Sequence, residues 1–211
     1  MSSRTRSRKT NDGAQPDNGA RENQPIMRQR APEIQAYGSM RSLPIGLEAD
    51  ARRQSCELLN QILADTITLY SLYKKHHWQV SGPTFYQLHL LFDKHAEEQL
   101  ALVDTLAERI QLLGGISTGM PAAVAKLSRI ENPPDGAEEV PVQISRLLEA
   151  HELICREVRE GIDSTEESKD WGTNDLLMSE VLRTNELQVW FIASHLVDEP
   201  VVKANGKSDL A

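Results

Sequence analysis

Four stretches of this chain repeat apolar side chains every three to four residues, the spacing that lines them up along one face of an α-helix. We expect four long helices, the first beginning between residues 47 and 51 and ending near Gln79, and the others at Phe85–Gly114, Val140–Ile162 and Thr173–Val197. A short helix is expected at 122–128, between the second and third helices, and a polar loop at 163–171. Helices that are apolar on one face must pack together, so the pattern predicts an all-α four-helix bundle.

The two ends of the chain differ in composition from the bundle. Residues 1–45 are rich in Arg, Ser, Asn, Gln, Gly and Pro, so they cannot bury enough apolar surface to offset the entropy of ordering. We therefore expect a flexible basic N-terminal tail (1–45), the bundle (46–200) and a short C-terminal tail (201–211). Residues 1–41 carry eight Lys or Arg against four Asp or Glu, whereas the whole chain has a net charge of −8. A basic arm thus precedes an acidic body.

The compartment can be inferred from the cysteines and from hydropathy. The two cysteines, Cys56 and Cys155, lie far apart and have no CxxC or CxxH neighbours, which favours free buried thiols in a reducing cytosol over a disulfide. No apolar core of a signal peptide follows the basic N-terminus, and no apolar run has the length of a membrane span. We expect a cytoplasmic protein without a membrane partner.

The second expected helix carries one histidine and three acids on a single stripe. The stripe consists of His89, Asp93, Asp104 and Glu108. At about 100° per residue these positions fall near 0°, 40°, 60° and 100° around the helix axis. Charged side chains at helical spacing usually face water, but this stripe borders apolar side chains and follows His77–Trp78 across a tight turn. His95 falls on the opposite side of the helix, where we expect it in solvent.

The spacing along the axis divides the stripe into two half-sites. His89 and Asp93 are one turn apart, as are Asp104 and Glu108, so each pair can converge on one point. The pairs are roughly 16 Å apart along the helix, so one metal ion cannot contact both pairs of one chain. Two copies of the helix, antiparallel about a two-fold axis near residues 98–99, would join the pairs into two identical sites. Imidazole with carboxylates suits iron, zinc or manganese, and the excess of carboxylates favours iron.

At these residues the chain resembles the Dps family, the DNA-binding proteins from starved cells, also called miniferritins. The family pattern stands here as His77-Trp78, Gly82, Phe85, Leu88-His89, Phe92-Asp93, Asp104, Glu108-Arg109 and Gly114-Gly115. The resemblance covers roughly residues 47–198. It implies a ferritin-like four-helix bundle with a short extra helix in the connection between helices two and three. It also implies that twelve subunits form a hollow shell, a homododecamer.

The resemblance further implies a ferroxidase centre at each two-fold interface. The metal ligands would be His77, His89 and Asp93 of one subunit with Asp104 and Glu108 of another. In this arrangement Glu108 bridges two irons, and zinc is an alternative occupant. Family members oxidise Fe(II), preferring hydrogen peroxide to dioxygen, and store ferric mineral, which removes both reactants that damage DNA. Trp78 would supply an electron beside the site or serve as an aromatic anchor of the core.

Two more groups of residues take an expected role from the resemblance. Family pores are acidic and concentrate cations, and the candidates for a pore that admits Fe(II) are Glu166, Glu167, Asp170 and Asp175. A solvated loop is the alternative for these acids. Flexible tails in the family often bind DNA, and the candidates for this role are Arg4, Arg6, Arg8 and Lys9.

Three functions follow from these patterns. The favoured one is a peroxide-consuming ferroxidase and iron store that protects the cell from oxidative damage. The second is mainly a DNA-compacting, nucleoid-associated protein in which twelve tails act together through multivalency and iron chemistry is secondary. The third is a structural shell whose site binds zinc without turnover.

Overall fold

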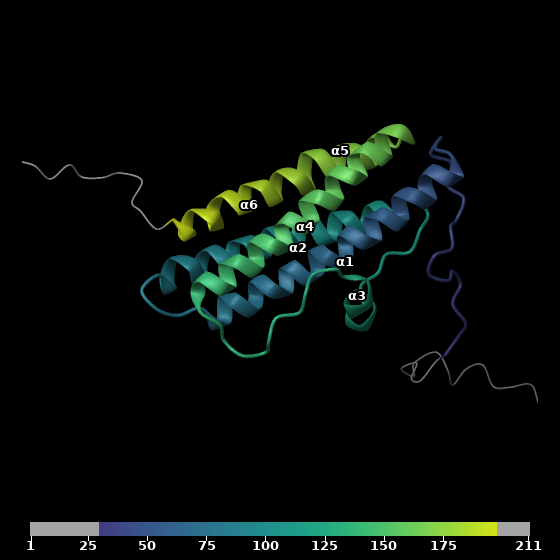
Figure 1. Ribbon diagram of the computed structural model, residues 1–211. Helices are drawn as coiled ribbons and strands as arrows, with labels where there is room; N and C mark the ends of the chain where they lie inside the picture. Colours follow the sequence, from purple (N-terminus) through teal and green to yellow (C-terminus); the bar gives the residue numbers. More distant parts are fainter. Residues whose placement is uncertain (1–29, 198–211) are drawn as a thin grey trace, which may run out of the picture. The chain divides into compact units, whose positions relative to one another are not determined.

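The computed structural model describes residues 30–197, and every regular element among them is helical (Figure 1). The long helices are α1 (Ala49–Gln79), α2 (Phe85–Leu112) and α4 (Val140–Glu167), and the short α3 (Pro121–Leu127) lies in the α2–α4 connection. The last rod of the bundle consists of α5 (Trp171–Leu176), a π-helical segment (Leu177–Leu182), α6 (Arg183–Ala193) and a 3₁₀ turn (Ser194–Leu196). The all-α, ferritin-like bundle with a short extra helix is thus confirmed.

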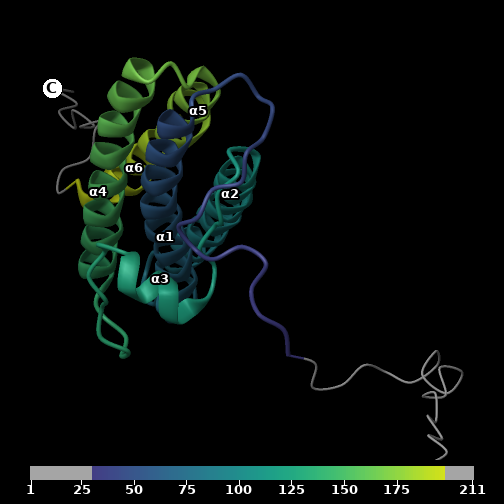
Figure 2. The same cartoon turned by 90° about the vertical axis from the view of Figure 1, so that its right-hand side faces the viewer.

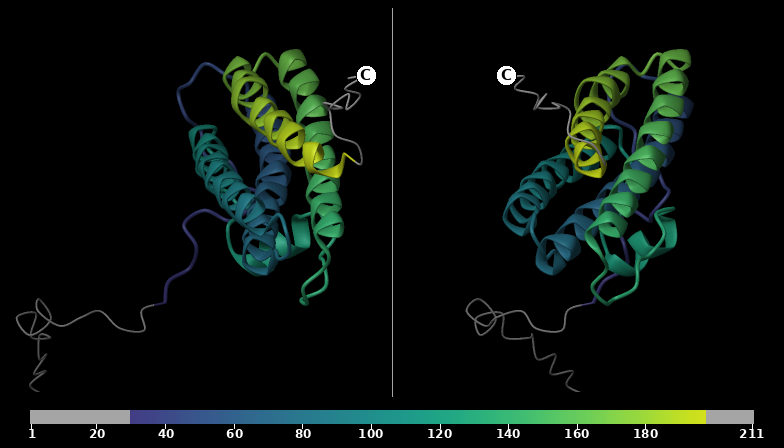
Figure 3. Two further views of the ribbon diagram at one scale, coloured as in Figure 1. Left: turned by 90° about the vertical axis from the view of Figure 1, so that its left-hand side faces the viewer. Right: turned by 60° about the vertical axis from the view of Figure 1, so that its left-hand side comes forward.

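The bundle lies within residues 35–197, and its four rods pack side by side (Figures 2 and 3). α1 packs along α2 and against α4, while α4 packs against α6. The buried face of each rod follows the apolar pattern of its sequence. The largest fully buried side chains are Tyr73, Phe92, Leu59, Ile62, Leu63, Leu69, Leu88, Leu106, Ile110, Leu113, Ile144 and Leu147. Each such aliphatic side chain contributes about 1.5–3 kcal/mol through its removal from water.

The turn between α1 and α2 is short because glycine permits its geometry. Gly82 has a φ of 94°, a conformation that residues with a Cβ rarely adopt, and its carbonyl accepts the backbone N–H of Phe85 at 3.1 Å. The chain therefore reverses within the five residues 80–84 and starts α2. This reversal brings the C-terminal turn of α1 beside the first turns of α2.

The predicted polar loop at 163–171 is wrong for most of its length. α4 continues to Glu167, and only residues 168–170 separate it from α5. Tertiary contacts override the weak helix propensity of this segment, because Thr165 is buried and its hydroxyl oxygen accepts a hydrogen bond from the side-chain amide of Asn174 on α5 at 3.1 Å. The amide of Asn174 on α5 also donates to the Ile162 carbonyl at 2.8 Å. These bonds fasten the end of α4 to the following helix.

Part of the expected N-terminal tail is held against the bundle. The backbone N–H of Arg41 donates to the Gly114 carbonyl at 2.8 Å, and the buried Arg52 guanidinium donates to the Arg41 carbonyl at 2.8 Å. The side-chain amide of Gln35 reaches the same Gly114 carbonyl at 3.0 Å. Residues 1–29 of the predicted tail, which include the candidate DNA-binding residues, and the predicted C-terminal tail (201–211) lie outside the described residues.

Two other expectations can be compared with the structure. Cys56 and Cys155 are both free and buried, as their sequence context favoured. Among residues 30–197 no helix is long and apolar enough to cross a membrane.

Candidate metal centre

Three of the five predicted ligands meet where α1 ends and α2 begins. His77 lies in the last turn of α1, while His89 and Asp93 lie one turn apart on α2. The imidazole rings of His77 and His89 stack with centroids 3.8 Å apart and planes inclined by 19°. The Nε2 atom of His77 lies 3.9 Å from Oδ1 of Asp93. The structure thus brings three of the predicted ligands to the same turn, where the rest of the site stays a prediction.

Hydrogen bonds to the backbone fix the proton on both imidazole rings. Nδ1 of His77 lies 2.7 Å from the carbonyl oxygen of His89, and Nδ1 of His89 lies 2.9 Å from the carbonyl oxygen of His77. A carbonyl oxygen can only accept, so each Nδ1 carries the hydrogen of the neutral ring and donates it. Each Nε2 is therefore left with a free lone pair, the form in which imidazole binds a metal ion.

The sequence patterns did not predict that Lys74 binds the carboxylate of Asp93. Nζ of Lys74 lies 2.5 Å from Oδ1 of Asp93 and 6.0 Å from the ring centroid of Trp78. The hydrogen bond from Lys74 is the main cause that lowers the pKa of Asp93, and the nearby His77 lowers it further. Lys74 precedes His77 by three residues, so helical spacing alone places both on one face of α1. An ammonium group thus stands where a metal cation would contact Asp93.

The other two predicted ligands, Asp104 and Glu108, lie farther along α2 with their side chains exposed. Within the described part of the chain, no three His, Cys, Asp or Glu side chains come close enough together to hold a metal ion. The five predicted ligands therefore form two separate groups along one subunit. Leu90, Leu100 and Leu112 are about half exposed on the same face of α2, which therefore mixes apolar and acidic groups.

The remaining candidates differ in how they are exposed. Trp78 is 72% exposed at the end of α1, so within one subunit it is not an anchor of the core. Glu166, Glu167 and Asp175 are exposed, as a pore lining requires. Asp170 does not fit this role, because its carboxylate is buried, pairs with Arg109 at 2.6 Å and accepts the Thr173 backbone N–H at 3.2 Å as the cap of α5.

Three histidines outside the predicted ligand set are buried. His95, expected in solvent, is 1% exposed, and burial lowers its pKa to about 4. Burial likewise lowers the pKa of His76 to about 4 and that of His151 to about 3, so all three rings are neutral near pH 7. The prediction for His95 was wrong because α2 packs against α1 and also contacts residues of α6, so two of its faces are buried.

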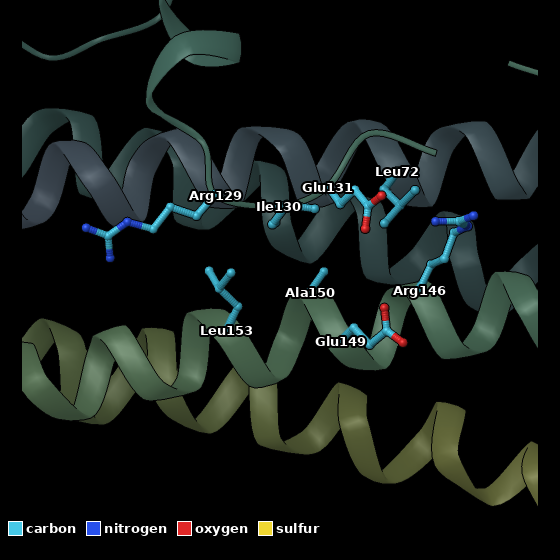
Figure 4. A pocket seen from close by; sticks show the side chains of 8 residues that line it. All are labelled: Leu72, Arg129, Ile130, Glu131, Arg146, Glu149, Ala150 and Leu153. Carbon is cyan, nitrogen blue, oxygen red and sulfur yellow. The ribbon is translucent and has the colours of Figure 1, made fainter. Parts of the chain in front are cut away.

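A surface cavity of about 190 Å³ lies away from these residues, between α4 and the segment that follows α3 (Figure 4). Arg129 and Arg146 stand at its edges with Ala150 and Leu153 of α4 along one wall. Both arginines are already paired, Arg129 with Glu157 and Arg146 with Glu138, each at 2.8 Å. The cavity therefore offers no free cation to an anionic ligand, and we do not assign it a role in the metal chemistry.

Comparison with known proteins agrees with the geometry of the bundle. A family model for the ferritin-like domain matches residues 56–200. The solved structure of DpsC from Streptomyces coelicolor superposes with a TM-score of 0.80 at 57% identity, over 82% of this chain and 100% of that one. A nutrient stress-induced DNA-binding protein from Synechococcus is 31% identical over 79% of this chain and 94% of its own length. A DNA protection during starvation protein from Agrobacterium fabrum is 28% identical, over 72% and 94% respectively.

Proposed function

This chain belongs to the Dps family of ferritin-like proteins, and we propose that it is a ferroxidase that oxidises Fe(II), preferably with hydrogen peroxide, and stores ferric mineral in a shell of twelve subunits. The observation that carries the proposal is the pair of stacked imidazoles, His77 and His89, whose Nε2 lone pairs are free beside Asp93. Neutral imidazole and carboxylate are ligands that suit iron.

The other half of the site would come from a second subunit. An antiparallel, two-fold contact between two α2 helices would place Asp104 and Glu108 of one copy opposite His77, His89 and Asp93 of the other. The half-exposed leucines on this face of α2 support the contact, since apolar side chains of this size favour burial against a partner. Glu108 would bridge two irons, and the negative carboxylates would offset the charge of both ions.

Two Fe(II) ions bound in one site would let hydrogen peroxide be reduced without release of a radical. Hydrogen peroxide needs two electrons and two protons to form two molecules of water, and two Fe(II) ions supply both electrons within one site. No one-electron product of peroxide then leaves the protein. The exposed Glu166, Glu167 and Asp175 would draw Fe(II) toward the interior, because a negative opening concentrates cations.

Stopped-flow measurement of Fe(II) oxidation tests the proposal. We expect hydrogen peroxide to oxidise Fe(II) faster than dioxygen in the wild-type protein, and the double variant Asp104→Ala/Glu108→Ala to lose most of this rate. The matched control is Glu152→Ala/Glu160→Ala, which removes two exposed carboxylates from α4. Equal rates in the two double variants would refute the site, and equal rates with and without protein would refute the enzyme.

DNA binding is a second candidate function, supported by the names of the relatives and by the basic residues Arg4, Arg6, Arg8 and Lys9. Twelve copies of a weak basic arm would bind DNA through added valency, with a steep dependence on salt. We propose a cytoplasmic protein that associates with the nucleoid in this way. Gel shifts at several salt concentrations, with and without residues 1–10, test it, and an unchanged shift after the deletion would exclude the arm.

A further inference from the structure

Six polar side chains meet in the centre of the bundle, surrounded by its apolar core. We call them the core polar cluster, and its members are Tyr73, His95, Gln99, His151, Asn185 and Gln188. Every one of them is at most 1% exposed. Burial of so many polar groups costs free energy unless hydrogen bonds replace water, and the six are joined by a continuous series of such bonds. The proposed iron site uses none of them.

The direction of these bonds can be read from Asn185. Its amide nitrogen donates to the Val181 carbonyl at 2.7 Å, so its Oδ1 must be the acceptor for Nδ1 of His151 at 2.8 Å. With the hydrogen on Nδ1, Nε2 of His151 carries a lone pair and accepts the hydroxyl hydrogen of Tyr73 at 2.5 Å. Nδ1 of His95 lies 3.2 Å from the same hydroxyl oxygen and can donate to it. Tyr73 is thus a phenol whose hydrogen points at a fixed, neutral base.

The backbone around Asn185 is built to support this arrangement. The π-helical segment Leu177–Leu182 ends three residues before Asn185, and Val181, whose carbonyl orients the Asn185 amide, belongs to it. A π turn inside an α-helix carries one extra residue and rotates everything that follows, and such turns are frequent at functional sites. Here the rotation leaves Asn185 and Gln188 inside the bundle, both at 0% exposure.

Tyr73 lies close to the proposed iron site along two routes. It precedes His77 by four residues on α1, so the two side chains are neighbours one turn apart. Its ring also packs on Phe92, with centroids 6.1 Å apart, and Phe92 is followed directly by Asp93. The next residue after Tyr73 is Lys74, whose ammonium group bonds Asp93. The phenol therefore lies one helical turn from His77 and packs on the residue that precedes Asp93.

The position of Lys74 suggests why a buried electron donor would be useful near the proposed site. Because the ammonium group competes for Asp93, the iron position that uses Asp93, which we call the second, should fill less readily than the other. When peroxide meets a site that holds only one Fe(II), one of the two electrons it needs is missing. Without a second donor in the protein, that encounter would release a hydroxyl radical.

We propose that Tyr73 supplies this missing electron and that His151 receives its proton. The inference rests on the proposed ferroxidase function. In the step, the O–O bond of hydrogen peroxide breaks, one electron comes from Fe(II) and one from Tyr73, and two solvent protons complete two molecules of water. The O–H bond of Tyr73 breaks at the same time, its proton passes to Nε2 of His151, and a neutral tyrosyl radical remains. A later Fe(II) returns the electron, and His151 returns the proton.

The protonation states of the pair agree with this sequence of events. Burial raises the pKa of Tyr73 well above its ordinary value, so the phenol cannot lose its proton before it is oxidised. The low pKa of His151 leaves Nε2 unprotonated near neutral pH, ready to accept. Trp78, by contrast, is exposed in the subunit, so a radical on its ring would be less protected from solvent.

Electron paramagnetic resonance of the full, assembled protein tests the proposal in two arms. In the first arm the metal-free protein is oxidised by light with a ruthenium(II) polypyridyl complex and persulfate. In the second, one Fe(II) per site is mixed with hydrogen peroxide and frozen, and hydroxyl radical is counted with a spin trap. The variants are Tyr73→Phe, His151→Gln and the control Tyr70→Phe, which removes a partly buried tyrosine of the same helix.

We expect a tyrosyl signal in both arms for the wild type and Tyr70→Phe, and its loss in Tyr73→Phe together with a several-fold rise in trapped hydroxyl radical. His151→Gln keeps the phenol but removes the base, so the signal should fall severalfold. Wild-type protein grown with ring-deuterated tyrosine identifies the signal as tyrosyl even if a variant fails to fold, since its hyperfine splitting must narrow.

A signal that persists in Tyr73→Phe, or no tyrosyl signal in the wild type, would overturn the proposal. If peroxide does not oxidise Fe(II) at all, the ferroxidase function fails and the donor role with it, whereas the light-driven arm still shows whether Tyr73 is the oxidisable residue.

Discussion

Replacing Lys74 by methionine should strengthen the binding of the second iron in each site. Methionine keeps an unbranched stem of similar length but removes the ammonium group that lies 2.5 Å from Asp93. In the wild type an incoming Fe(II) must either displace this ammonium group or bind beside it. The substitution therefore tests the effect of the Lys74 charge while the shape of the half-site stays nearly the same.

The size of the effect follows from the exposure and the charges. Lys74 and Asp93 side chains are 24% and 38% exposed, so breaking their pair costs about 0.2–1 kcal/mol, as for other partly solvated ion pairs. If the ammonium group stays, a unit charge and a divalent ion about 4 Å apart repel by roughly 2 kcal/mol in water-like surroundings. We expect the cheaper course, displacement, to dominate, so Lys74→Met should tighten the second binding step by about 1 kcal/mol, or about fivefold.

Anaerobic calorimetric titration of the assembled protein with Fe(II) measures this directly. The first binding step should change little, and the second should tighten. The matched control is Lys75→Met, which removes the same charge from the next residue, where the ammonium group bonds Gln79 and the Gly136 carbonyl instead. The reasoning is refuted if Lys74→Met leaves the second step unchanged, or if Lys75→Met tightens it equally.

Three further predictions concern the fold and the assembly. Burial raises the pKa of Glu157 from 4.5 to about 7, so its contribution to stability is present below pH 4.5 and lost as pH rises through 7. Urea unfolding should show a loss of about 3 kcal/mol over this range, and Glu157→Gln should abolish it. Gly114→Ala should cost about 1–3 kcal/mol of unfolding free energy, because its φ is 91° and a Cβ would lie 2.3 Å from a carbonyl oxygen; Gly119→Ala, with open space around it, should cost less than 0.5 kcal/mol, and equal costs would contradict the strain. Leu100→Glu should dissociate the proposed two-fold contact and slow Fe(II) oxidation without loss of helix content, as sedimentation and circular dichroism can show. The exposed Val142→Glu on α4 should leave the proposed assembly intact.

The long helices were predictable because their apolar periodicity is the same signal that packs them. The predicted starts at Phe85 and Val140 coincide with those of α2 and α4, since a glycine–proline turn and a proline-rich break precede them. The end of α4 was not predictable in this way. Residues 163–167 are polar, and they are helical because Thr165 is buried and Asn174, on the next helix, donates hydrogen bonds to the Thr165 hydroxyl and the Ile162 carbonyl.

The sequence predicts that His77, His89 and Asp93 lie together at the α1–α2 turn, as they do, but it does not predict the bonds within this group. Helical spacing places Asp93 near His89, but it does not show that Lys74 reaches across from α1 to Asp93. Nor could a stripe analysis reveal the buried position of His95, because it assumes that a helix has one buried face. The π-helical segment left no recognisable mark in its sequence, since it contains neither proline nor glycine.

The paired histidine–carbonyl bonds determine how the orientation of one histidine responds when the other is substituted. Each imidazole is oriented by a carbonyl of the main chain, and a side-chain substitution leaves that carbonyl in place. Loss of His77 would therefore remove one ligand while the acceptor that aims His89 survives, and the reverse also holds. Each of these two predicted ligands is oriented by the main-chain carbonyl of the other residue and not by its imidazole. A substitution of one histidine should therefore leave the hydrogen bond that orients the other.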